Sequence, residues 1–218
     1  MNENKSLNPM LIVVASIALL AGLWLGFLTD QKKTATPPEI YGTLLPVAKT
    51  LTTFHLLNQN NQAFTVQNLR DNWSLIFVGY THCPDICPTT LTSLQQTMEL
   101  MQTQAIAFPK VIFISVDPER DTPDVLAKYV SYFNKDFIGV TGSDTELKNI
   151  TAQLAVYYRK AAGSSGDISN QDYLMDHSAA LMLINPQGEL QAFLTAPHIP
   201  AQISESIKRS MQYYDDTH

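Results

Sequence analysis

The stretch Trp73–Leu91, WSLIFVGYTHCPDICPTTL, decides how this chain folds. Its first part, Ser74–Tyr80, is short, apolar and rich in β-branched and aromatic residues, which predicts a buried strand. Cys87-Pro88-Thr89-Thr90 then begins a helical pattern, and proline suits the first turn of a helix because its missing N–H costs no hydrogen bond there. One face of this helix carries Leu91, Leu94, Met98 and Met101. The stretch therefore predicts a strand-to-helix junction.

Both cysteines of the chain, Cys83 and Cys87, lie at this junction. The free N–H groups and the dipole of a helix N-terminus favour an anion, and such positions lower the pKa of a thiol. The two thiols could form a reversible disulfide, bind a soft metal as thiolates, or serve as small inert residues. Three residues separate them, whereas thioredoxin-type redox motifs have two. Their place at the junction favours the two reactive uses.

The 218 residues are enough for one domain plus an appendage, and the net charge of −6 comes without a basic stripe. We therefore expect no nucleic-acid partner. Residues 10–28 carry no charge and predict a transmembrane helix. A cleaved signal peptide is the alternative, but its apolar region is usually shorter, about 7–15 residues. Lys5 before the segment and Lys32 and Lys33 after it leave its orientation undecided.

These patterns divide the chain into four parts. We expect a short tail over residues 1–9, a transmembrane anchor over 10–29, a tether over 30–50 and a folded domain over 51–218.

Within the folded domain, strand patterns and helix patterns alternate. We expect a first hairpin over Thr53–Leu57 and Ala63–Val66, and single strands over Trp73–Tyr80, Lys110–Val116 and Phe137–Val140. We expect helices over Cys87–Gln102, from Thr122-Pro123 onward and over Asp144–Lys160, followed by a flexible loop over Gly163–Asp172. A second hairpin over His177–Ile184 and Glu189–Leu194 and a terminal helix over Pro200–Tyr214 complete the domain. This order predicts a layered α/β domain with a parallel centre and antiparallel hairpins at its edges. Ligands of such sheets gather at the carboxyl ends of the central strands, where Cys83 and Asp117 lie.

A histidine is the natural third ligand for a metal held by two thiolates. His177 follows the flexible loop and precedes an apolar strand, so it could be a ligand or a satisfied surface histidine. His82 adjoins Cys83, but adjacent side chains in an extended loop diverge. We interpret His55 as structural, and His198 lies in a Pro-rich loop.

Three motifs in the same order resemble the Sco (Sco/SenC) family of copper chaperones, which help to assemble the copper centre of cytochrome c oxidase. They are Trp73–Leu91, VDPERDTP over residues 116–123 and YLMDHSA over residues 173–179. The resemblance extends over nearly the whole chain through the single N-terminal apolar segment, Leu51–Leu69, Val140-Thr141-Gly142 and the Asn185-Pro186-Gln187-Gly188 turn.

The resemblance implies a thioredoxin-like fold with N-terminal and C-terminal β-hairpin additions, preceded by one transmembrane helix. It also implies copper bound by Cys83, Cys87 and the distal His177. The chemistry agrees, because soft thiolates select Cu(I) and an imidazole completes a three-coordinate site. Cu(II) binding stays open. Asp176 is a candidate for orienting the imidazole.

The function that the resemblance implies is a copper metallochaperone, anchored in the inner membrane with its domain facing the periplasm. It would deliver copper to the copper-bearing subunit of cytochrome c oxidase or to another copper chaperone. The alternative is an enzyme, a thiol-disulfide oxidoreductase that reduces the cysteines of the oxidase copper site through a reversible Cys83–Cys87 disulfide. A structural zinc site ranks last, because zinc needs four ligands and only His82 or Asp85 offers a fourth nearby.

Overall fold

The computed structural model describes residues 9–29, 36–163, 166 and 172–218. Near the N-terminus, Pro9–Thr29 form helix α1. No helix among the described residues combines the length and the apolar character that a membrane span needs, so the structure does not support the predicted transmembrane anchor. The larger of the two compact units of the chain, Pro37–Asp215, holds every element that the site described below uses.

Eight strands of the described residues form one sheet in the order β1-β10-β9-β4-β5-β6-β2-β3. These strands are β1 (Gly42–Thr50), β2 (Leu56–Asn58), β3 (Ala63–Phe64), β4 (Ser74–Gly79), β5 (Lys110–Ser115), β6 (Ile138–Thr141), β9 (Leu181–Ile184) and β10 (Glu189–Leu194). β4, β5 and β6 are parallel, and the outer pairs are antiparallel. The predicted parallel centre with antiparallel edges is confirmed.

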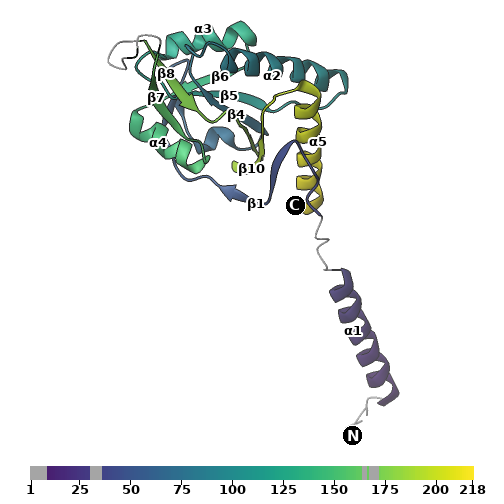
Figure 1. Cartoon of the computed structure of the whole chain (residues 1–218). Helices are drawn as coiled ribbons and strands as arrows, with labels where there is room; N and C mark the ends of the chain where they lie inside the picture. The colour runs from purple at the N-terminus through teal and green to yellow at the C-terminus, as the bar shows by residue number, and fades with distance from the viewer. Residues whose placement is uncertain (1–8, 30–35, 164–165, 167–171) are drawn as a thin grey trace. The chain divides into compact units, whose positions relative to one another are not determined.

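Helices cover both faces of this sheet. They are α2 (Ile86–Thr103), α3 (Pro123–Phe133), α4 (Asp144–Gln153) and α5 (Pro200–Thr217). The ring of Phe113 on β5 contacts the ring of Tyr129 on α3, whereas the neighbouring Ile112 and Ile114 belong to the core cluster that contains Leu147 of α4. Since successive side chains of a strand point to opposite faces, α3 and α4 lie on opposite sides. Figure 1 shows α2 and α3 on one side and α4 on the other.

The central strands place two loops side by side. All six residues of β4 are buried, and β4 pairs with β5 in a regular parallel register that ends at Gly79 opposite Ser115. The loop after Gly79 carries both cysteines, and the loop after Ser115 carries Asp117. Both loops therefore leave the sheet at its carboxyl edge, as the sequence predicted.

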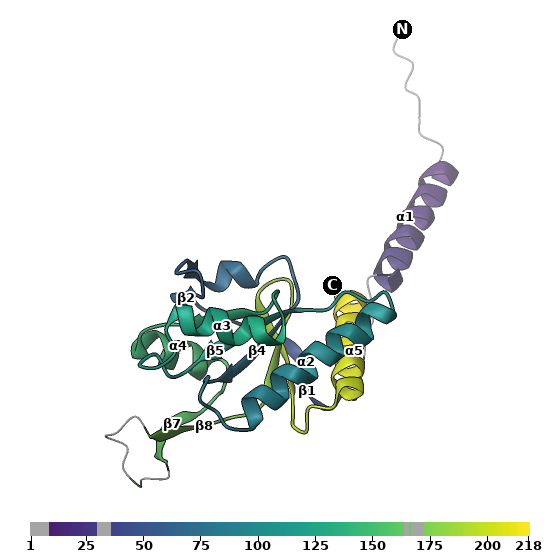
Figure 2. The ribbon, with the colours of Figure 1, turned by 90° about the horizontal axis from the view of Figure 1, so that it is seen from above.

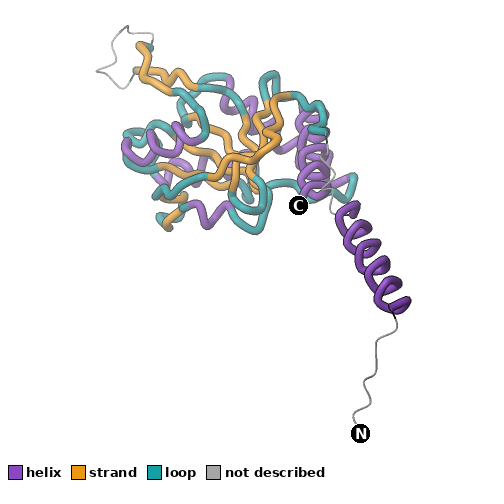
Figure 3. Tube along the Cα trace, turned by 90° about the horizontal axis from the view of Figure 1, so that it is seen from below, coloured by secondary structure: helices purple, strands orange, loops and turns teal. Residues whose placement is uncertain are grey.

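A second, two-stranded sheet lies outside the main one. It pairs β7 (Tyr158–Ala162) with β8 (Tyr173–His177) in antiparallel fashion, and Figures 2 and 3 show it standing out from the main sheet. The prediction of one helix over Asp144–Lys160 was wrong in its second half. The helix ends at Gln153 because Ala155 adopts a left-handed φ of 53°, and two tyrosines, which favour strands, follow.

Two further expectations differ from the structure. His177 was expected to open the second hairpin of the main sheet, but it ends β8, and that hairpin begins at Leu181. The tether predicted over residues 30–50 was wrong for Gly42–Thr50, which form edge strand β1 on β10. Pro46 obscured this strand, since proline cannot donate to a ladder; it lies where the register of the pair shifts, a position that tolerates it.

Candidate metal centre

The cysteine half of the site is built at the N-terminus of α2. Cys87 is the second residue of this helix, and its backbone N–H donates to the sulfur of Cys83 over 3.4 Å. Asp85, the N-cap residue, makes no side-chain capping bond, so the Cys83 sulfur takes up a helix N–H that would otherwise lack an acceptor. Both thiols are free, Cys83 is partly exposed and Cys87 is fully buried.

The two thiols have opposite electrostatic environments. A hydrogen bond from the Cys87 thiol, helped by the backbone N–H groups of Cys87 and Asp85, lowers the pKa of Cys83 to about 3. The same hydrogen bond, together with burial, raises the pKa of Cys87 above its ordinary value. The reduced pair therefore carries one negative charge, located on the accessible sulfur, and thiolate is the form that binds metals and attacks disulfides.

Gly79 makes room for the buried sulfur. A Cβ added at this position would lie 2.5 Å from the sulfur of Cys87 and 2.8 Å from the ring of Phe113. Only glycine can therefore end β4 without displacing the sulfur of Cys87 or the ring of Phe113. We did not single out Gly79 from the sequence, although a glycine that ends a buried strand directly before two cysteines was the available signal.

The histidine half comes from β8. The His177 ring meets Phe77 and Tyr80 edge-on, with ring centroids 6.2 and 6.1 Å apart, and its Nε2 lies 3.6 Å from the sulfur of Cys87. Its Nδ1 lies 3.1 Å from the backbone oxygen of Ser178. Because a carbonyl oxygen only accepts, Nδ1 carries the hydrogen in this contact and Nε2 presents its lone pair to the sulfurs.

Asp176 does not take the orienting role suggested for it. It lies on the outer face of the hairpin, where it accepts from Nε of Arg159 over 3.0 Å. The Ser178 carbonyl makes the contact with the imidazole instead.

The three predicted ligands meet in space. The two sulfurs and a ring nitrogen of His177 all lie within 4.8 Å of one another, although Cys87 and His177 are 90 positions apart in the sequence. Two thiolates and one imidazole form the donor set that suits Cu(I), and the residues present fit a copper ion by ligand type and by convergence. No fourth nitrogen, sulfur or carboxylate ligand joins this group within the described residues, so a four-coordinate structural zinc site has no support here.

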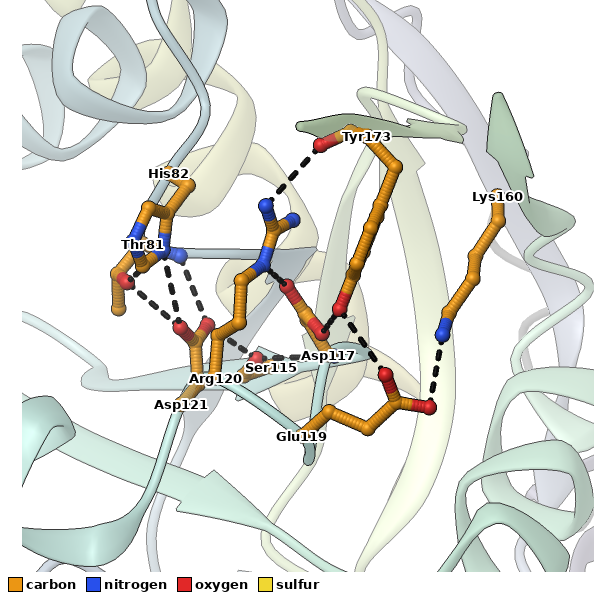
Figure 4. A network of polar contacts seen from close by, with 9 residues as sticks. All are labelled: Thr81, His82, Ser115, Asp117, Glu119, Arg120, Asp121, Lys160 and Tyr173. Atoms are coloured by element: carbon orange, nitrogen blue, oxygen red, sulfur yellow. Dashed lines mark hydrogen bonds and ion pairs between the residues drawn. The ribbon is translucent and has the colours of Figure 1, made fainter. Parts of the chain in front are cut away.

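A second group of possible ligands, His82, Asp117 and Asp121, lies within the same separation of one another. Its carboxylates already have other partners. Asp121 accepts from the N–H and the hydroxyl of Thr81, at 2.8 and 2.6 Å, and Asp117 accepts from Arg120. Figure 4 shows these contacts as parts of one polar network, so we interpret the group as structural. Of the other histidines, His198 contacts the carbonyl of Ala179.

The comparisons with known proteins agree with this geometry. The family model described as SCO1/SenC matches residues 44–212. This chain belongs to the SCO1/SenC family. A SCO2-like protein of Rickettsia felis is 34% identical over 201 residues, which cover 91% of this chain and 95% of that protein.

Solved SCO1/SenC structures share the fold. The crystal structure of Arabidopsis thaliana ScoI with copper bound is 32% identical, covers 75% of this chain and 98% of its own, and superposes with a TM-score of 0.69. BsSco is described as a member of the Sco family of cytochrome c oxidase assembly proteins with a disulfide switch. Its structure is 18% identical, covers 79% of this chain and 98% of its own, and superposes with a TM-score of 0.55. The predicted thioredoxin-like α/β fold is thus confirmed as a Sco fold.

Proposed function

We propose that this protein is a copper metallochaperone that binds one Cu(I) through Cys83, Cys87 and His177 and passes it to the copper-bearing subunit of cytochrome c oxidase or to another copper chaperone. The observation that carries the proposal is the convergence of two sulfurs and an imidazole nitrogen within 4.8 Å. It is supported by the copper bound in the structure of the Arabidopsis relative and by the description of BsSco as a member of the Sco family of cytochrome c oxidase assembly proteins.

The site suits cargo that must leave again. Three ligands leave Cu(I) open to attack by a ligand of a recipient protein, and Cys83 is exposed enough to be reached. Transfer by ligand exchange needs no change of oxidation state, because the recipient's ligands replace those of the donor while the metal stays Cu(I). The buried Cys87 and the hairpin-borne His177 hold the ion from the inner side until then.

A second candidate function is thiol-disulfide exchange with the cysteines of the oxidase copper site. The lowered pKa of Cys83 beside the buried Cys87 favours it, since such a thiolate is the group that attacks a disulfide. In this reaction, Cys83 attacks a partner disulfide and forms a mixed disulfide, and Cys87 then displaces the partner. The partner gains two electrons, and the Cys83–Cys87 pair becomes a disulfide.

Replacing His177 with alanine, with both cysteines kept, separates the two functions. Loss of a partner outside the metal's ligand set costs 10–100-fold in metal affinity, so we expect the loss of a ligand to weaken Cu(I) binding by at least about 10-fold. The rate of thiol exchange should stay close to that of the wild type, because it depends on the thiolate and on access to it. Oxidase maturation in cells that carry only the His177→Ala protein is the functional measurement.

The matched variant is Cys83→Ser, which abolishes both functions. The chaperone proposal predicts that His177→Ala and Cys83→Ser both impair oxidase maturation. If maturation survives His177→Ala and fails in Cys83→Ser, the protein works by redox exchange and copper binding is incidental. If both variants mature oxidase normally, neither function stands.

We also propose that the domain works on the periplasmic side of the inner membrane. The support is that BsSco is described as a member of the Sco family of cytochrome c oxidase assembly proteins. A phosphatase that is active only outside the cytoplasm, fused after His218, should be active. An inactive phosphatase in a stable fusion would contradict this location.

A further inference from the structure

We propose that Tyr173 is a positioning residue for His177, and that residues 117–121, here called the bracket loop, hold it in place. The inference rests on the proposed copper site, and it explains how the imidazole of His177 is held in position at that site. The bracket loop follows β5 at the carboxyl edge of the main sheet. Figure 4 shows its side chains reaching Thr81 on one side and Tyr173 on the other.

The bracket loop contacts both the side chain and the backbone carbonyl of Tyr173. The phenol of Tyr173 donates to Oδ1 of Asp117 over 2.6 Å, and Nη1 of Arg120 donates to the Tyr173 carbonyl over 3.1 Å. The guanidinium carbon of Arg120 also lies 3.7 Å from the centroid of the Tyr173 ring. Arg120 and Asp117 form an ion pair whose side chains are only 8% and 0% exposed. Charged groups that are so well buried and hydrogen-bonded fix geometry well.

The position of His177 depends on these contacts between the bracket loop and Tyr173, here called the clamp. The reason is that side-chain contacts hold the β7–β8 hairpin against the rest of the domain. β8 pairs with β7, and within the described residues neither strand joins the main sheet. Tyr173, Met175 and His177 alternate along β8 and so share its inner face, of which Tyr173 and Met175 are buried. The tilt of the hairpin is therefore set by the contacts of this inner face.

Tyr173 and His177 lie at the two ends of β8. Four residues of strand span about 13 Å, so a tilt of about 5° at Tyr173 moves the imidazole by about 1 Å. Nε2 of His177 is 3.6 Å from the sulfur of Cys87, and a displacement of that size decides whether the two can share one ion. A residue at the far end of the strand can thus control the third ligand without touching it.

The same loop also holds the cysteine half. Asp121, the neighbour of Arg120, accepts from the N–H and the hydroxyl of Thr81, two residues before Cys83. Ser115 donates to the same carboxylate from the end of β5. Consecutive residues of the bracket loop thus fix the start of the cysteine loop and the hairpin. The loop sets the distance between the two halves of the site.

The test is Tyr173→Phe in the full-length protein, which removes only the hydroxyl that donates to Asp117. We expect Cu(I) binding, measured by competition with a Cu(I)-specific chelator, to weaken about 10-fold, the lower end of the range for residues that orient ligands. X-ray absorption of the loaded variant should show a weaker imidazole contribution at unchanged sulfur number. The matched control is Arg159→Gln, which removes an exposed ion pair from the outer face of the same hairpin and should leave both readings unchanged.

A double-mutant cycle shows whether Tyr173 acts through His177. In a His177→Ala background, Tyr173→Phe should change Cu(I) affinity by less than about twofold. If Tyr173 acts only by positioning the imidazole, its substitution has no further effect once the imidazole has been removed. An equal loss in both backgrounds would show general damage to the domain and would overturn the inference. Should Tyr173→Phe fold poorly by thermal unfolding, Arg120→Lys, which keeps the charge and loses the planar fork of donors, takes its place in the same cycle.

The outcomes also separate this inference from the proposed function. If X-ray absorption of the Cu(I)-loaded wild-type protein shows no imidazole ligand, the proposed copper site itself is wrong. If the wild-type protein shows one and Tyr173→Phe binds Cu(I) as tightly as wild type, only the positioning role is wrong.

Discussion

Cys87 and His177 face each other across 3.6 Å, but the structures that carry them differ. Cys87 is fully buried at the start of an 18-residue helix that packs against the central strands. His177 ends a five-residue strand of a hairpin that is separate from the main sheet. The sulfurs are thus fixed by the core, whereas the imidazole is delivered by a small element held by side-chain contacts. Changes in the cysteine half should damage both the fold and the site, and changes in the hairpin should alter the site alone.

The largest effect is expected for Cys87→Ser. Serine replaces a soft thiolate with a hydroxyl that Cu(I) does not favour, and we expect Cu(I) affinity to fall at least about 100-fold. Chelator competition on the reduced full-length protein measures it. A variant that keeps wild-type affinity would show that the buried sulfur is not a ligand, and the comparison between the two halves would lose its basis.

Gly79→Ala should damage the cysteine half through packing. The new methyl group would lie 2.5 Å from the sulfur of Cys87, and overpacking of this kind costs about 1–3 kcal/mol of the free energy of unfolding. Urea unfolding of the metal-free protein checks this value. Gly22→Ala is the control, because a Cβ there would meet nothing within 4 Å. Equal stability of the two variants would contradict the tight fit around Cys87.

Asp176→Asn should have only a small effect on stability and on Cu(I) affinity. It tests whether the outer face of the hairpin contributes to the site. The carboxylate pairs with Arg159 on the exposed face, and such surface pairs contribute about 0–1 kcal/mol. We expect Cu(I) affinity to change by less than about twofold, since the Ser178 carbonyl, and not Asp176, contacts the imidazole. A loss as large as that of His177→Ala would restore the orienting role of Asp176.

The smallest expected effect is that of pH on the alkylation of Cys83. Its pKa is lowered to about 3, so the thiolate is already formed across the range from about pH 5 to 8. The alkylation rate of the reduced, metal-free protein should be nearly flat there, whereas the rate of an ordinary thiol rises about tenfold per pH unit below its pKa of about 8.5. A tenfold rise per unit would mean that the hydrogen bonds from Cys87 do not hold the charge on Cys83.

Local patterns were enough to predict the cysteine half. Strand β4, the helix start near Cys87 and the cap of α3 at Thr122 with Pro123 after it all follow from residues that are close in sequence, and the structure contains each of them. The alternation of strands and helices was likewise enough for the parallel centre of the sheet.

The hairpin half could not be predicted in the same way. The turn at Ala155 ends α4 in a left-handed conformation that alanine rarely adopts, so the sequence carried no signal for the end of α4 at Gln153. The clamp on Tyr173 joins residues more than 50 positions apart, and the partner of the His177 Nδ1 is a backbone oxygen, which every residue possesses. For His177 itself, the resemblance to the Sco family decided between a ligand and a surface histidine.

X-ray absorption of the Cu(I)-loaded, reduced full-length protein tests the central claim most directly. The account predicts one copper per chain with two sulfur neighbours and one imidazole nitrogen, and it predicts that the imidazole signal disappears in His177→Ala. A best fit with four sulfurs would show that two chains share the ion. A wild-type spectrum without an imidazole nitrogen would contradict the account, because His177 would then lie beside the copper without binding it.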